Sequence, residues 1–66
     1  MSRTAYIERL QALENAIKLS IGESEDYDGP ADPLHLVEAS RCGLPVDSRV
    51  SKGDLLSAVQ LQIRAS

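Results

Sequence analysis

The residues of this chain that could support chemistry are few and lie mostly apart. The segment Asp26-Tyr27-Asp28-Gly29 has the composition found at the centre of a calcium-binding loop. With Gly29 at the sixth position, the first ligand would be Ser24 and the twelfth His35, where such a loop requires an acid and a bidentate Glu. We therefore interpret the segment as a solvated acidic connector and predict no metal site.

Two other reactive side chains, His35 and Cys42, are each the single residue of their type. A catalytic or metal-binding role for His35 would need partners such as Asp32 or Glu38, and a lone His near a helix start is usually structural. Cys42 falls at a predicted helix carboxyl end, where the dipole does not stabilise a thiolate. Because the chain also lacks a nucleophile elbow and a Gly-rich phosphate loop, we expect no enzymatic activity and no cofactor.

Charge is divided unevenly along the 66 residues, whose formal net charge is −3. Residues 1–40 hold three cations and eight acids, net −5, and residues 41–66 hold four cations and two acids, net +2. The four cations of the second part are Arg41, Arg49, Lys52 and Arg64. The two parts are therefore expected to serve different tasks.

The elements that must position these residues are predicted to be helices. Apolar residues recur at steps of three and four in the first part of the chain, which places them on one side of a helix. They are Tyr6, Leu10, Leu13, Ile17 and Ile21. Ser2 or Thr4 can cap the start, and Gly22 suits the left-handed residue that ends a helix. The pattern predicts a helix from about Thr4 to Ile21.

Two alternatives stay open for this apolar stripe. It packs on the rest of its own chain, or it binds a second copy through Tyr6, Leu10, Leu13 and Ile17. The second alternative is favoured by Ala12, Ala16 and Leu19 on the far side, which offer further apolar contact. The small size of the chain also leaves its stability marginal, so that a partner or a dimer would help.

A second helix is predicted from Pro33 to Cys42. The carboxylate of Asp32 can accept backbone N–H groups, and proline is well suited to the first helical position. Gly43 can adopt the left-handed conformation at the end, and Leu44 can fold back onto the last turn.

A third helix is predicted to begin at Ser51-Lys52-Gly53-Asp54. Ser51 and Asp54 are spaced as in a capping box, and Val50 and Leu55 are spaced as in a hydrophobic staple. The apolar face of this helix consists of Leu55, Leu56, Val59 and Ile63.

One family resemblance covers Leu36 to Val59. The residues that carry it are Ala39, Gly43-Leu44, Arg49, Ser51-Lys52, Asp54-Leu55-Leu56 and Ala58-Val59. With these residues the segment resembles the amino-terminal domain of the transcription terminator Rho, a helix, extended loop, helix module. The interval of nine residues from Gly43 to Lys52 fits that family. It is two residues longer than in the similar SAP modules that bind DNA.

The resemblance implies a small regulatory or binding protein that associates weakly with DNA or RNA. Arg41, Arg49, Lys52 and Arg64 would then contact phosphates. The alternative function is protein interaction, in which a structural or inhibitory accessory protein, such as a phage-type or virion component, uses the same module for docking. We expect a protein partner or a homo-oligomer in either case.

Together these patterns predict an all-α chain. Residues 1–22 form a long amphipathic helix, residues 23–32 an acidic linker, and residues 33–66 a compact helix, extended loop, helix unit. No secretory signal and no membrane-spanning stretch are found in the sequence, so the expected location is the cytoplasm.

Overall fold

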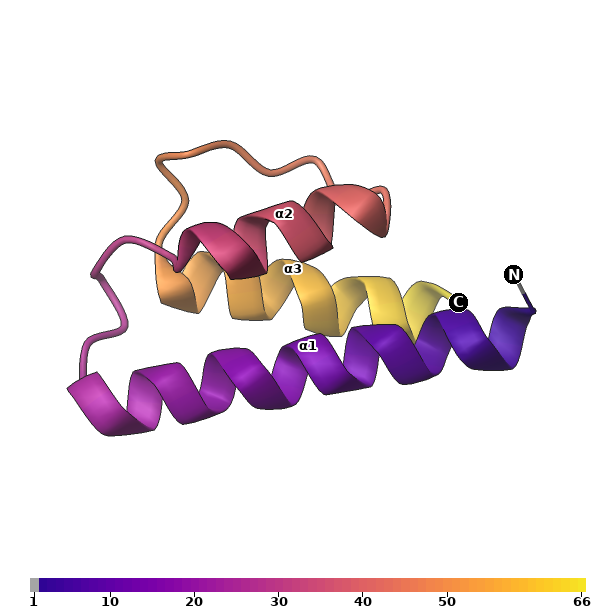
Figure 1. The fold of residues 1–66 in the computed structure, drawn as a ribbon, viewed down its shortest axis with the longest axis horizontal. Helices are drawn as coiled ribbons and strands as arrows, with labels where there is room; N and C mark the ends of the chain where they lie inside the picture. Colours follow the sequence, from indigo (N-terminus) through magenta and orange to yellow (C-terminus); the bar gives the residue numbers. More distant parts are fainter. Residues whose placement is uncertain (1) are drawn as a thin grey trace.

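Three helices form the computed structural model, which describes residues 2–66 (Figure 1). The helices are α1 (Arg3–Ser24), α2 (Pro33–Arg41) and α3 (Lys52–Ala65). At 1.5 Å per residue, α1 is about 33 Å long, which is also the longest dimension of the 33 × 21 × 18 Å molecule. The prediction of an all-α chain with a long first helix is confirmed. Met1, the first residue of the predicted amino-terminal segment, lies outside the described residues.

The first helix is the element on which the other two pack. In Figure 1, α2 and α3 both run antiparallel to α1. Each packs against α1, whereas α2 and α3 contact each other little. All three helices contribute to one core, whose buried residues are Leu10, Leu13, Ile17, Ile21, Ala31, Ala39, Cys42, Leu44, Leu55 and Val59. Residues 1–22 and 33–66 therefore share a single core.

The stripe on α1 is the largest part of this core. Leu10, Leu13, Ile17 and Ile21 are all buried, and Tyr6 packs against them at the edge. Of the two alternatives for the stripe, the structure shows packing within the same chain. The prediction that Tyr6, Leu10, Leu13 and Ile17 bind a second copy is corrected accordingly, because α2 and α3 already cover these side chains.

The end of α1 differs from the prediction. Ser2 caps the start as expected, because its Oγ accepts a hydrogen bond from the N–H of Ala5 at 3.1 Å. Gly22 does not end the helix, which continues to Ser24. Glu25 instead adopts the left-handed conformation, with φ of 51°, and its N–H donates to the carbonyl of Ile21. Ile21, the predicted last residue, is buried within the helix.

The second helix begins and ends close to the predicted residues. The carboxylate of Asp32 accepts a hydrogen bond from the N–H of Leu34 at 2.9 Å, and Pro33 is the first helical residue. After the helix, Gly43 has a φ of 83°, and the N–H of Leu44 donates to the carbonyl of Ala39 at 3.0 Å. Leu44 thereby folds back and becomes buried, as predicted.

The connector between α1 and α2 is held by hydrogen bonds to residues around the start of α3, which the acidic composition did not indicate. Asp26 and Asp28 are exposed, but Gly29 and Ala31 are buried. The N–H of Ala31 donates to the carbonyl of Val50 at 3.2 Å, and Gly29 accepts from the N–H of Lys52 at 3.0 Å. These bonds flank an isolated antiparallel bridge between residues 30 and 51. The connector therefore fixes the start of α3 relative to the end of α1.

The third helix begins at the predicted cap. The Oγ of Ser51 accepts a hydrogen bond from the N–H of Asp54 at 3.1 Å. Leu55 and Val59 are fully buried, and Leu56 and Ile63 pack at the edge of the core. None of the described helices is both long enough and apolar enough to cross a membrane.

Candidate functional site

The four predicted phosphate-binding cations lie on different elements of the fold. Lys52 is the first residue of α3 and Arg64 lies in its last turn, so about 18 Å of helix separates them. Arg41 is the last residue of α2, which starts on the same side of the molecule as α3 and runs away from that side (Figure 1), and Arg49 is exposed in the loop that leads to α3. The fold therefore does not gather these cations into one patch.

Two of these cations have partners within the chain. A guanidinium nitrogen of Arg41 lies 3.8 Å from the carboxylate of Glu38, and the Nζ of Lys52 donates to the Oγ of Ser24 at 3.0 Å. The Lys52 contact is possible because α1 continues beyond Gly22. It places the ammonium beside the last residue of α1, where the acidic connector begins.

The reactive residues singled out from the sequence are also separated. His35 lies in a groove between α1 and α2 near Glu38. Cys42 is buried, and its carbonyl oxygen accepts a hydrogen bond from the Tyr6 hydroxyl at 2.6 Å. Among residues 2–66, no group of three or more His, Cys, Asp or Glu side chains is placed to hold a metal ion.

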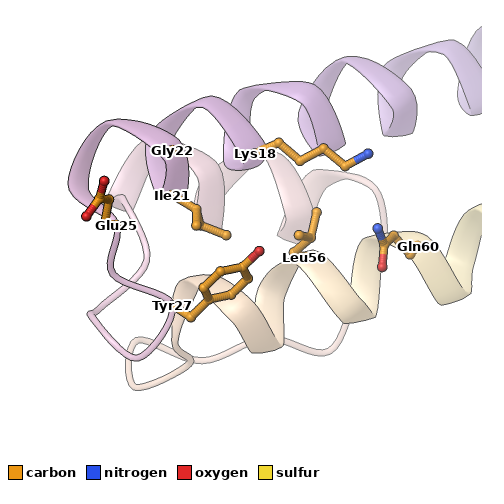
Figure 2. Close-up of a pocket in the computed structure, with 7 residues that line it drawn as sticks. All are labelled: Lys18, Ile21, Gly22, Glu25, Tyr27, Leu56 and Gln60. Carbon is orange, nitrogen blue, oxygen red and sulfur yellow. The ribbon is translucent and has the colours of Figure 1, made fainter.

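A pocket at the carboxyl end of α1 combines side chains that no sequence pattern groups together. Its volume is about 510 Å³, and it lies between the end of α1 and the first half of α3, with the connector on its third side (Figure 2). We call it the Tyr27 pocket. Its lining residues are Lys18, Ile21, Gly22, Glu25, Tyr27, Leu56 and Gln60.

Backbone contacts to α3 hold Tyr27 in place. The carbonyl of Tyr27 accepts a hydrogen bond from the N–H of Gly53 at 3.0 Å, in the first turn of α3. The chains approach so closely that a Cβ at Gly53 would lie 3.2 Å from both the Tyr27 carbonyl oxygen and its Cδ1 atom. The glycine is therefore what allows the connector to lie against α3 and present the Tyr27 ring.

The pocket has an apolar base and polar ends. In Figure 2 the Tyr27 ring stands between Ile21 of α1 and Leu56 of α3, and its hydroxyl points into the space between the helices. Ile21 is buried and Leu56 is half-buried, whereas Tyr27 is 61% exposed. Glu25 and the Lys18 ammonium lie on opposite sides of the Tyr27 ring in Figure 2.

The arrangement is suited to binding. An exposed aromatic ring and two aliphatic side chains can receive an apolar group. The Tyr27 hydroxyl and the Gln60 amide can donate and accept hydrogen bonds at the rim. The nearest ion pair joins Lys18 Nζ to the Glu14 carboxylate at 3.7 Å, as the i,i+4 spacing predicts.

From the sequence, Tyr27 is assigned to the acidic connector. Its type was nevertheless a signal, because it is one of only two aromatic residues in the chain and stands among acids. Leu56 was assigned to the apolar face of the third helix. Nothing in the sequence pairs these two residues, which are 29 positions apart.

Comparisons with known proteins add no family to this description. The sequence matches no protein family model, and searches of curated proteins and of solved structures found no match either.

Proposed function

We propose that this chain is a non-enzymatic docking module whose Tyr27 pocket receives an apolar side chain of a partner protein. The observation that carries the proposal is the exposure of Tyr27 over the apolar side chains of Ile21 and Leu56. Aromatic residues beside an apolar pocket are typical anchors of protein interfaces. The connector's hydrogen bonds to α3 support this role because they hold the ring in place before a partner binds.

The charge around the pocket favours a partner segment that carries cations. Glu25 lines the pocket, and Glu23, Asp26 and Asp28 are exposed on the same stretch of chain. The lining cation Lys18 is paired with Glu14 at 3.7 Å. Complementary charges raise the association rate and select among partners more than they raise affinity. The partner is therefore expected to present an apolar side chain next to Lys or Arg.

Nucleic-acid binding is the competing proposal, and it is supported by the resemblance to the amino-terminal domain of Rho. The positions of the cations speak against it. Arg49 and Lys52 lie near the start of α3, close to the acidic connector, whereas Arg41 ends α2 and Arg64 lies in the last turn of α3. Cations that are spread over the molecule and lie beside acids contact few phosphates at once. Counterion release therefore contributes little to the affinity for nucleic acid.

A peptide selection tests the docking proposal. A library of short random peptides is displayed and selected on the folded chain, and the recovered peptides are then measured against Tyr27→Ala. Leu61→Ala is the matched control, because Leu61 is 63% exposed on α3 and does not line the pocket. Recovered peptides should carry an apolar residue near a cation. Their affinity for the Tyr27→Ala variant should be at least tenfold lower than for the natural chain, as expected for an interface anchor. Their affinity for the Leu61→Ala variant should be unchanged.

Two outcomes would overturn the docking proposal. One is a set of peptides that bind Tyr27→Ala as tightly as the natural chain. The other is tight binding of unrelated single- or double-stranded DNA or RNA at low salt that is lost in Arg49→Ala with Lys52→Ala. If these two cations contact phosphates, the double substitution should also flatten the slope of log affinity against log salt by up to about two units.

A further inference from the structure

A second surface, distinct from the Tyr27 pocket, lies on α1 and α2. We call it the α1–α2 face, and its residues are Ala12, Ala16, Leu19 and Leu34. Leu34 and Leu19 are 74% and 68% exposed, more than any other large apolar side chain among residues 2–66. Ala12, Ala16 and Leu34 line one groove, and Leu19 follows Ala16 by one helical turn.

We infer that the α1–α2 face binds the same face of a second copy, with the two α1 helices antiparallel. A two-fold axis makes such an interface self-complementary, since each residue that contacts the partner is contacted in return. The smallest residues of the face, Ala12 and Ala16, allow the helices to approach most closely at the centre. Placing Ala12 opposite Ala16 of the other copy therefore fixes the register.

This register pairs opposite charges, which is the argument for a second copy as the occupant. Glu23 falls opposite Ala5 of the other copy, and Arg9 lies one turn beyond Ala5 on the same side of the helix. Both Arg9 and Glu23 are exposed. Each dimer would thus contain two symmetrical pairs between Arg9 and Glu23. Glu8 falls opposite Ser20, which carries no charge.

The same register places Leu19 where Arg9 of the other copy can cover it. Leu19 falls opposite Arg9 of the other copy, between Ala5 and Ala12, where the aliphatic stem of Arg9 can cover it. The pairing of Arg9 with Glu38 in the same chain is long, at 3.9 Å, and both side chains are nearly half exposed. Arg9 can therefore turn towards a second carboxylate at little cost.

The expected association is modest in strength. A stable specific interface buries about 800 Å² on each partner, which is roughly one fifth of this molecule's 4,383 Å² of accessible surface. The α1–α2 face offers only two large exposed aliphatic side chains. We therefore expect a monomer at low micromolar concentration and a dimer as the concentration approaches the millimolar range.

Sedimentation equilibrium across that concentration range tests the inference. The natural chain should change from monomer to dimer, and Leu19→Asp should remain monomeric. The matched control is Leu61→Asp, which adds the same charge at a side chain with 63% exposure on α3. It should dimerise as the natural chain does. Circular dichroism should show both variants folded, since both positions are exposed.

Charge reversal tests the register. Arg9→Glu and Glu23→Arg should each weaken the dimer several-fold, because each variant places like charges across the interface, and the double variant should recover the natural affinity. A natural chain that stays monomeric throughout, or a dimer that Leu19→Asp leaves unchanged, would overturn the inference. Charge variants whose effects simply add would overturn the antiparallel register.

Discussion

The Tyr6 hydroxyl joins the three helices through two hydrogen bonds. It donates to the carbonyl of Cys42, after α2, and accepts from the Nε2 of Gln62, in α3, at 3.2 Å. Both groups are partly buried, so water does not fully replace the hydroxyl if it is removed. One side chain near the start of the chain thereby links the ends of the other two helices.

Replacing this hydroxyl should therefore destabilise the fold. Tyr6→Phe should lower the free energy of unfolding by about 1–2 kcal/mol, because it leaves the Cys42 carbonyl without its donor. The control is Tyr27→Phe, because the Tyr27 hydroxyl makes no hydrogen bond within the described part of the protein. Urea denaturation followed by circular dichroism measures both, and an equal loss in the two variants would contradict the role given to Tyr6.

A second prediction at this scale concerns the cap of α3. Ser51→Ala should cost about 1 kcal/mol, because the N–H of Asp54 loses its acceptor. In a domain of this size that loss lowers the melting temperature by about 4–8 °C. Ser57→Ala, at an exposed position within the same helix, is the control and should leave the melting temperature nearly unchanged. An unaltered melting temperature in Ser51→Ala would mean that the cap contributes nothing.

At the scale of the elements, two glycines that sequence reasoning treated alike have opposite roles. Gly22 and Gly43 were both predicted to adopt the left-handed conformation at a helix end. Gly43 does so, with φ of 83°, but Gly22 lies within α1. A Cβ added to either glycine would meet no atom within 4 Å, so only the backbone conformation distinguishes the two positions.

The same substitution should therefore change stability in opposite directions. Gly22→Ala should raise the free energy of unfolding by up to about 1 kcal/mol, because alanine loses less entropy in a helix. Gly43→Ala should lower it by about 1 kcal/mol, because a Cβ disfavours positive φ. Denaturant titrations of the two variants check this. Stabilisation by both, or by neither, would contradict the observed end of α1.

The starts of the helices were predictable because caps are local. Ser2, Asp32 and Ser51 each satisfy backbone N–H groups within three residues, and no distant contact is needed. The end of α1 was not predictable in this way. It depends on the connector, which is anchored to the start of α3 by hydrogen bonds between residues more than 15 positions apart.

The candidate site was less predictable than the helices for the same reason. Lys52 and Arg49 lie close together in sequence and Arg64 follows in the same helix, but helix length separates Lys52 from Arg64. Tyr27 and Leu56 meet only because the connector folds back on α3. Sequence spacing alone could indicate the face of a helix on which a residue lies, but not which faces meet.

At the scale of the whole molecule, stability depends on one small core centred on α1. Ile17 is fully buried between the other helices, and Leu19, two residues later, is 68% exposed. A 66-residue domain has a total free energy of unfolding of about 3–10 kcal/mol. Loss of a single core side chain can therefore consume most of it.

Ile17→Ala should lower the free energy of unfolding by about 2–5 kcal/mol. Leu19→Ala, measured at low micromolar concentration where the chain is monomeric, should change it by less than about 0.5 kcal/mol. Because all three helices share the core, the helical circular dichroism signal and the tyrosine signal of Tyr6 should change in the same unfolding transition. Separate transitions for α1 and for residues 33–66 would contradict a single cooperative unit.

The beginning of α1 and the end of α3 lie at the same end of the molecule, as Figure 1 shows and as the hydrogen bond between Tyr6 and Gln62 confirms. A short peptide joining Ser66 to Ser2 would thus close the backbone into a ring without disturbing the core. Such a cyclic chain loses entropy chiefly when unfolded, so it should melt at a higher temperature. New termini opened in the exposed stretch around residues 47–49 would give a circular permutant with the same three helices in a new order.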